Sequence, residues 1–95
     1  MLLHVTKAEY VGDYKVDVSF NDGRKGVADL SPALRGGVFA PLKDKDLFSK
    51  LAVDAELGTI SWPNGVDLAP EYIYFQAFRG EPELQGQFQR WGYCA

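Results

Sequence analysis

Residues 58–70 constrain the fold of this chain more than any other stretch, because their sequence, Gly-Thr-Ile-Ser-Trp-Pro-Asn-Gly-Val-Asp-Leu-Ala-Pro, is dense in turn-forming residues. Asn64-Gly65 is a pair preferred in two-residue hairpin loops, where both central residues need positive φ. The residues on either side of this pair predict two short strands, at 59–62 and 66–68. The stretch therefore predicts a tight β-hairpin.

A strict alternation of apolar and polar residues runs from Tyr14 to Phe20. A period of two is typical of a strand with one face buried and the other in solvent. Segments 5–11 and 24–30 predict neighbouring strands, and turn residues at Gly12-Asp13 and at 21–23 separate the three segments. The first thirty residues therefore predict an antiparallel meander.

The middle of the chain predicts short helices joined by a loop. Ser31-Pro32 fits an N-cap followed by proline at the first helical position, which predicts a helix that ends at residue 35. The apolar residues 38–42 are expected to form a loop that packs against the sheet. Asp44 or Asp46 is expected to cap the next helix.

Two acidic residues each lie just before a predicted helix. A fourth strand is predicted over 53–57, and after the hairpin Pro70 opens a helix that extends to residue 78. Asp67 comes just before this helix, and Asp29 comes just before the Ser-Pro pair. We expect both carboxylates to accept hydrogen bonds from backbone amides at these turns.

These elements together predict a single α+β domain over residues 1–78, with a meander sheet, a short middle helix, the hairpin and a C-terminal helix. The helix at 71–78 is apolar nearly all round, which predicts burial against a second surface. Residues 79–95 form a tail rich in aromatic residues, whereas disordered tails are usually poor in them. We expect this tail to dock on the domain or on a partner subunit.

The composition excludes several classes of protein. The net charge of −3 argues against a nucleic-acid binder, which normally carries a basic patch. The single cysteine, Cys94, cannot form an internal disulfide. No leader peptide is evident, and no apolar run approaches the roughly 20 residues of a membrane span. We expect a cytoplasmic protein.

Residue types that support catalysis are scarce. His4 is the single histidine, and with Cys94 it gives no spacing typical of a metal site. No glycine-rich phosphate loop is present. We therefore expect no catalytic, cofactor-binding or metal-binding residue. The alternative is a small-molecule or enzymatic pocket lined by aromatic residues and by Asp29 and Asp67, which requires the fold to bring these two acids together.

Trp62 fits two roles. It can cover the hairpin from within the core, with its indole N–H on a carbonyl, or it can anchor a partner at the surface. The six Phe, five Tyr and two Trp are numerous for 95 residues, which favours an interaction surface. The candidates for such a surface are Trp62, Tyr72, Tyr74, Phe88, Trp91 and Tyr93, and the residues expected to fix the backbone are Asn64, Gly65, Asp67 and Asp29.

Four motifs together resemble the bacterial domain-of-unknown-function family 2442: Phe-Asn-Asp-Gly at 20–23, Asp-Leu-Ser-Pro at 29–32, Gly-Gly-Val-Phe-Ala-Pro-Leu at 36–42 and the run at 58–71. The resemblance covers residues 3–76, and Trp-Pro-Asn-Gly-x-Asp-Leu-x-Pro at 62–70 is its most specific part. It implies a small α+β domain with no established activity. Some members are joined to a helix-turn-helix domain, and many are encoded beside another tiny protein, as in toxin–antitoxin pairs. Residues 79–95 are too few for a helix-turn-helix, so direct DNA binding is not expected.

We therefore expect a small non-enzymatic interaction module, without cofactors, that homodimerises or binds a small co-encoded protein through its aromatic residues. The aromatic excess without a catalytic grouping supports this hypothesis. The small-molecule or enzymatic pocket described above is one alternative. A DNA-associated regulator is another, and it requires Arg24, Lys25, Lys43 and Lys45 to gather on one face.

Overall fold

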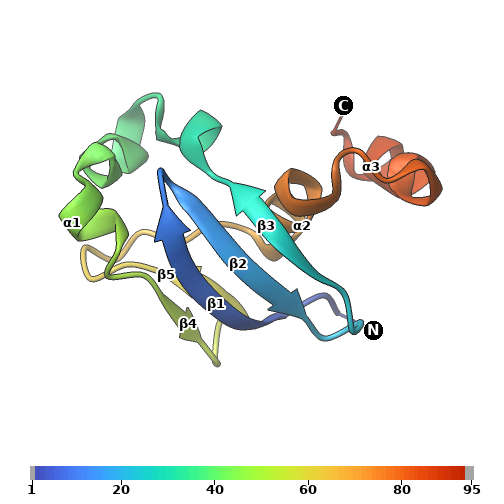
Figure 1. Ribbon diagram of the computed structural model, residues 1–95, viewed down its shortest axis with the longest axis horizontal. Helices are drawn as coiled ribbons and strands as arrows, with labels where there is room; N and C mark the ends of the chain where they lie inside the picture. Colours follow the sequence, from blue (N-terminus) through green and yellow to red (C-terminus); the bar gives the residue numbers. More distant parts are fainter. Residues whose placement is uncertain (1, 94–95) are drawn as a thin grey trace.

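A computed structural model describes residues 2–93. Its main element is a three-stranded antiparallel sheet of β1 (Val5–Gly12), β2 (Lys15–Phe20) and β3 (Lys25–Asp29), in the order β1-β2-β3 (Figure 1). The apolar positions of β2 are buried and the polar positions between them are at least partly exposed. The predicted meander, and with it the α+β class, is confirmed.

The turn between β1 and β2 lies one residue later than the sequence predicts. Gly12 closes β1 opposite Lys15, and the turn is Asp13-Tyr14, with φ of 52° and 61°. Positive φ at both central residues is what a type I′ turn requires, and its twist matches that of the strands. The Tyr14 hydroxyl donates a hydrogen bond to the Lys43 carbonyl, which ties this turn to the middle of the chain.

The first helical turn of the middle segment is a 3₁₀ helix, Ser31–Leu34, and the predicted cap at its start is wrong. The N-cap residue is Leu30, without a side-chain hydrogen bond. Ser31 instead donates both its N–H and its hydroxyl to Asp29 Oδ1, at 3.0 and 2.8 Å. Asp29 therefore fixes the turn, as expected of it, because a carboxylate two residues back competes for the serine donors.

Residues predicted as an apolar loop are helical. The segment Gly37–Lys43 forms a second 3₁₀ helix that buries Leu42 and leaves Val38 exposed. Helix α1 (Lys45–Phe48) follows it directly. Asp44 caps α1, as predicted, by accepting a hydrogen bond from the Asp46 N–H at 3.0 Å.

The strands β4 (Ala52–Asp54) and β5 (Thr59–Ser61) form a second, two-stranded antiparallel sheet. The second half of the predicted strand at 53–57 is wrong. Asp54 Oδ1 accepts the N–H groups of Glu56 and Leu57 at 2.9 and 3.1 Å. These bonds turn the chain after Asp54 and leave the Leu57 side chain exposed.

The chain reverses again at residues 62–65, but the turn differs from the predicted two-residue loop. Gly65 has φ of 86° and donates its N–H to the Trp62 carbonyl at 2.9 Å, whereas Asn64 lacks the expected positive φ. Trp62 N–H then donates to the Val66 carbonyl at 2.9 Å. Asp67 makes a single bridge to Ser61, so within the described residues no strand forms at 66–68.

Helix α2 (Pro70–Phe78) begins with proline at its first position, as predicted. The expected Asp67 cap is wrong, because the N-cap residue is Ala69, no side chain bonds to the helix start, and Asp67 is exposed. The tail contains a further helix that the sequence did not predict. A 3₁₀ turn, Pro82–Leu84, leads into α3 (Gln85–Trp91).

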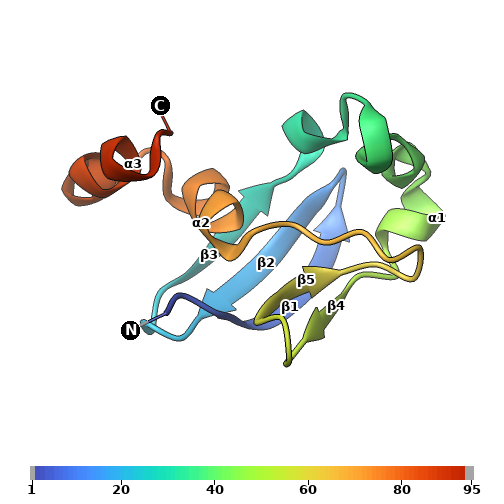
Figure 2. The ribbon, with the colours of Figure 1, turned by 180° about the vertical axis from the view of Figure 1, so that it is seen from behind.

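The core lies against one face of the three-stranded sheet. Figure 1 shows the other face bare, and Figure 2 shows β4, β5, the segment after them and α2 in front of the covered face. Within residues 2–93 no helix has the length and apolar character needed to cross a bilayer. The buried apolar residues are Val5, Val16, Val18, Phe20, Ala28, Leu30, Leu34, Leu42, Phe48, Ile60, Trp62, Leu68, Ile73, Tyr74, Phe75, Phe78 and Phe88.

Gly26 of β3 allows α2 to approach the sheet closely. A Cβ at this position would lie 2.8 Å from Cε1 of Phe78. That ring is itself packed between Phe20 and Tyr74, at centroid distances of 5.8 and 4.8 Å. We expect Gly26→Ala to lower the free energy of unfolding by about 1–3 kcal/mol, because the ring has to move within a filled core.

Urea denaturation followed by circular dichroism measures this effect. Gly80→Ala is the matched control, since a Cβ there meets nothing within 4 Å, and we expect it to change stability by no more than about 0.5 kcal/mol. Equal stability of the two variants would contradict the close approach of α2 to β3.

Candidate functional site

Trp62 belongs to the core and not to an interaction surface. Its side chain is 4% exposed, and its indole N–H donates to the Phe48 carbonyl at 2.9 Å. The indole also packs against the Phe48 ring, with centroids 5.5 Å apart. The surface role predicted for Trp62 is therefore wrong, because the rigid turn at 62–65 points the ring inward.

The other five predicted aromatic residues form one cluster that joins α2 to the tail: Tyr72, Tyr74, Phe88, Trp91 and Tyr93. Phe75 of α2 stacks on Tyr93 and meets Phe88 edge-on, with centroids 5.0 Å apart in both pairs. Tyr74 packs against Trp91 at 5.8 Å. Tyr74 and Phe88 are buried and the other three are half-buried. The tail thus packs on its own chain, and no flat, exposed aromatic patch exists among the described residues.

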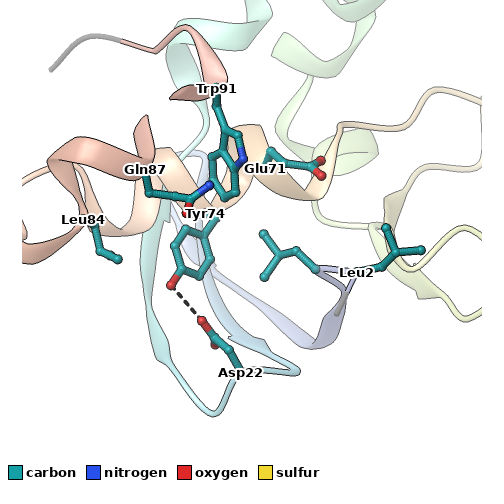
Figure 3. Close-up of a pocket in the computed structure, with 8 residues that line it drawn as sticks. Leu2, Asp22, Glu71, Tyr74, Leu84, Gln87 and Trp91 are labelled. Carbon is teal, nitrogen blue, oxygen red and sulfur yellow. Dashed lines mark hydrogen bonds between the residues drawn. The ribbon is translucent and has the colours of Figure 1, made fainter. Parts of the chain in front are cut away.

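A pocket of about 360 Å³ opens where this cluster meets the N-terminal segment (Figure 3). Its walls come from the N-terminus, the β2–β3 turn, α2 and the tail. It is lined by Leu2, Leu3, Asp22, Glu71, Tyr74, Leu84, Gln87 and Trp91. Segments from both ends of the chain therefore build one site.

Asn21 holds the N-terminal wall of the pocket in place. Its amide Nδ2 donates to the Leu2 carbonyl at 2.6 Å, and its Oδ1 accepts the His4 N–H at 2.9 Å. The Asn21 N–H also donates to the His4 carbonyl at 3.0 Å. One side chain in the β2–β3 turn thus binds the backbone on both sides of Leu3.

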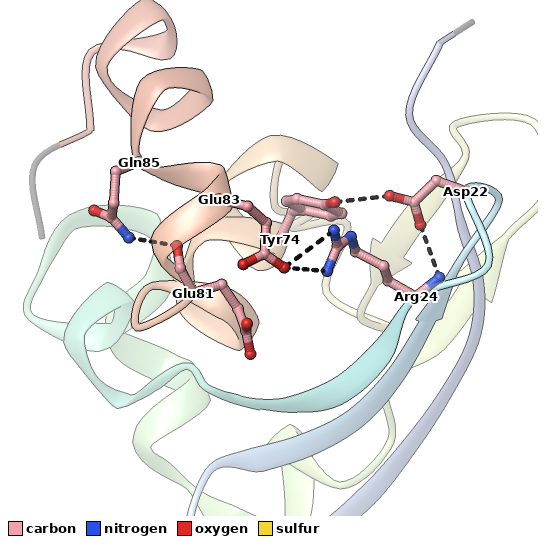
Figure 4. A network of polar contacts seen from close by, with 6 residues as sticks. All are labelled: Asp22, Arg24, Tyr74, Glu81, Glu83 and Gln85. Atoms are coloured by element: carbon pink, nitrogen blue, oxygen red, sulfur yellow. Dashed lines mark hydrogen bonds and ion pairs between the residues drawn. The ribbon is translucent and has the colours of Figure 1, made fainter.

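Asp22 and Tyr74 form the polar floor of the pocket. The Tyr74 hydroxyl donates to Asp22 Oδ2 at 2.7 Å, and Asp22 Oδ1 accepts the Arg24 N–H at 2.9 Å (Figure 4). The Arg24 guanidinium turns to Glu83 Oε1, 3.4 Å away. Burial, followed by the hydrogen bond to Asp22 and its negative charge, raises the pKa of Tyr74 to about 12. Tyr74 is therefore a neutral donor at physiological pH.

Glu71 supplies the second carboxylate of the pocket. It lies in the first turn of α2, where the positive end of the helix favours an acid. Among the described residues it has no hydrogen-bond or ion-pair partner. Its negative charge is nevertheless felt in the aromatic cluster. Burial raises the pKa of Tyr93, and the charge of Glu71 raises it further. The pocket thus carries two acids and no basic residue in its lining.

The acids that the sequence suggested for a shared site do not line this pocket. Asp29 is engaged with Ser31, and Asp67 is exposed beyond the turn at 62–65. Neither borders this pocket or the cavity on the three-stranded sheet that is described next. Within residues 2–93 no group of three or more His, Cys, Asp or Glu side chains is placed to hold a metal ion. Cys94 lies outside the described residues.

The second cavity, of about 430 Å³, lies on the three-stranded sheet. Its charged lining residues are Lys7, Glu9, Asp17 and Lys25, so two basic and two acidic side chains share this face. The other basic residues named for DNA association lie in two different parts of the chain, Arg24 just before β3 and Lys43 and Lys45 around the start of α1. Arg24 pairs with Glu83, and Lys45 pairs with Asp13 at 3.4 Å. The fold does not assemble them into one basic patch.

Several pocket residues are not among the predicted site residues. The sequence indicates only a turn at Asp22. Leu84 and Gln87 lie in the tail, where no helix was predicted. Their segments are about 60 residues apart in sequence, so no spacing or motif links them. Tyr74 and Trp91 were predicted, and they do meet in the pocket wall.

These features define a small α+β domain with a pocket completed by a C-terminal helix. A family model described as a protein of unknown function (DUF2442) matches residues 5–79, and the chain belongs to this family. The membership of this family that the sequence suggested is confirmed.

Among solved structures, the chain is similar to one titled "Crystal Structure of Putative DNA Binding Protein NE0471" from Nitrosomonas europaea ATCC 19718. The TM-score is 0.73 at 18% identity, over 98% of this chain. The chain spans 63% of the length of that protein chain. At this identity the similarity shows a shared fold only. A comparison with curated proteins found no match.

The bond between Tyr74 and Asp22 predicts a specific pH dependence of stability. Below about pH 10 tyrosine is protonated in both states, so Tyr74 contributes no pH dependence there. Between about pH 10 and 12 the unfolded state loses the proton while the folded state keeps it, so the free energy of unfolding falls as the pH rises. Over this range we expect wild type to lose up to about 2 kcal/mol more than Tyr74→Phe.

Urea denaturation at pH 9 to 11.5 compares the two proteins. Tyr72→Phe is the control, because its hydroxyl is on the same helix and bonds to the neutral Gln76 amide at 3.0 Å. We expect this control to keep the steep pH dependence of wild type. Equal slopes for wild type and Tyr74→Phe would show that the hydroxyl is not buried against Asp22.

Proposed function

We propose that this chain is a non-enzymatic protein-interaction domain whose pocket accepts a side chain from a partner protein. The observation that carries the proposal is the make-up of the pocket. Apolar side chains of Leu2, Leu84 and Trp91 surround a small number of polar groups, as in sites that recognise ligands by burial and fixed polar contacts. Leu2 is 78% exposed at the mouth of the pocket and gains the most from being covered.

The chemistry of the lining favours binding over catalysis. The Tyr74 hydroxyl and Asp22 bond to each other, and the raised pKa of Tyr74 disfavours the phenolate that a general base requires. The lining contains no serine, cysteine, histidine or lysine to act as a nucleophile. Glu71 has no hydrogen-bond partner among the described residues, so it belongs to no hydrogen-bonded acid–base pair.

A partner other than a second copy of the chain fits the exposed surface best. The aromatic residues expected to mediate dimerisation instead pack the tail against α2. The large exposed apolar residues, Leu2, Val11, Val27, Val38 and Leu57, lie in five different segments. Scattered single residues are normal at a protein surface, whereas a homodimer interface needs a continuous apolar patch.

DNA is a poorer candidate than protein. The similar structure from Nitrosomonas europaea is named for DNA binding, but over a third of that protein chain has no counterpart here. In this chain Lys7 and Lys25 share the open sheet face with Glu9 and Asp17. Such mixed charge does not attract a phosphate backbone as a basic patch does.

A peptide selection tests the proposal. The chain is panned against a displayed library of random peptides, and the selected peptides are titrated into ¹⁵N-labelled protein. We expect the indole N–H signal of Trp91 to shift, while that of Trp62, which is bonded to Phe48 in the core, stays constant. We expect Leu84→Ser to weaken binding about fivefold, because part of an apolar wall is lost.

Leu57→Ser is the matched control for this titration, since Leu57 is exposed on the β4–β5 turn outside the pocket. It should bind the peptides as wild type does. Peptides that shift only residues of the open sheet face, or a library that yields no binder sensitive to Leu84→Ser, would overturn the proposal.

A further inference from the structure

The electrostatics of the pocket indicate which side chain it accepts, and this inference rests on the function proposed above. The pocket lining contains two carboxylates, Asp22 and Glu71, and no basic residue. The basic residue next to Asp22 in sequence is Arg24, and its guanidinium is held by Glu83, with N–O distances of 3.4 and 3.5 Å. The pocket lining therefore carries two carboxylates and no cationic side chain.

The walls complement the non-polar part of a long cationic side chain. Trp91 is half-buried beside Tyr74 and offers an aromatic surface at which a cation is stabilised. Leu2 and Leu84 border the same space and can cover an aliphatic stem (Figure 3). An aliphatic stem that ends in a planar cation matches both features.

One acceptor in the pocket, Asp22, is fixed before any ligand arrives. Asp22 is oriented by the Tyr74 hydroxyl on one oxygen and by the Arg24 N–H on the other. Each carboxylate oxygen has two lone pairs, so Asp22 retains acceptor capacity, and Glu71 retains all of its own. Two carboxylates on different elements suit a guanidinium, which presents five N–H donors in a planar fork, better than the compact ammonium of lysine.

We propose that the partner's anchor is an arginine side chain, which inserts between Trp91 and the two leucines and donates hydrogen bonds to Asp22 and Glu71. The occupant is a segment of another protein that carries this arginine at an exposed position. The guanidinium and the carboxylates would then form a hydrogen-bonded ion pair in a partly desolvated pocket.

Model compounds test this proposal without any change to the protein. Nα-acetyl-arginine amide is titrated into ¹⁵N-labelled wild type, and its neutral isostere, Nα-acetyl-citrulline amide, is the control. We expect the arginine probe to shift the Trp91 indole N–H saturably, to bind at least fivefold more tightly than the citrulline probe, and to weaken as salt is raised. The indole N–H of Trp62 is the internal reference.

Charge-neutral variants locate the cation. Glu71→Gln and Asp22→Asn should each weaken the arginine probe several-fold, whereas Glu56→Gln, an exposed acid on the β4–β5 turn, should leave it unchanged. Equal binding of the arginine and citrulline probes would overturn the proposal. So would binding of Nα-acetyl-lysine amide as tight as that of arginine, since the planar fork is then not recognised.

The outcome is separable from that of the peptide selection. Selected peptides that bind in the pocket through uncharged residues would leave the interaction function standing and remove the arginine anchor. An arginine probe that binds at Trp91, together with a library that yields no pocket-dependent binder, would show a guanidinium site and remove the protein-interaction function.

Discussion

The side chain of Tyr74 is the point on which the rest of the structure depends. Its ring packs against Phe20 of the sheet at 4.9 Å and against Phe78 of its own helix at 4.8 Å. It also contacts Trp91 of the tail helix at 5.8 Å. Its hydroxyl ends at Asp22 in the β2–β3 turn. Because one residue joins the sheet, α2 and α3, the pocket beside it exists only when all three are assembled.

The Trp-Pro-Asn-Gly turn stabilises the opposite end of the core. The indole of Trp62 satisfies the Phe48 carbonyl near the end of α1, and the Thr59 hydroxyl donates to the Leu68 carbonyl at 2.5 Å. A buried polar group without a partner costs about 1–3 kcal/mol, so these bonds decide how the turn sits on the core. The most specific sequence motif therefore serves the fold, and the candidate site lies elsewhere.

The sequence predicts elements whose signal is local and fails where tertiary contacts decide. The alternation along β2 and the proline at the start of α2 gave correct elements, because each fixes backbone geometry within a few residues. Asn64-Gly65 did not form the two-residue loop, since Pro63 sets φ near −65° and shifts the positive φ to Gly65 alone. Asp67 precedes a helix whose start is fixed by Pro70, and no cap is formed.

Helix α3 and the pocket could not be predicted for a related reason. A helix of seven residues is marginal in isolation, and α3 is stable because Phe88 is buried against Phe75 and Tyr74. The sequence signal for a docked tail was its aromatic content, which indicated contact but not helical geometry. The pocket combines residues from four segments, so no window of sequence contains it.

The position of the family match bears on what the pocket is for. The match covers residues 5–79, which include Asp22, Glu71 and Tyr74. The apolar walls of the pocket come from outside this range: Leu2 and Leu3 precede it, and Leu84 and Trp91 follow it. The matched region thus supplies the fold and the fixed polar floor, and the flanking segments supply the walls. Under the proposal above, the acids of the matched region would select a cationic side chain, and the walls from the flanking segments would contact its stem.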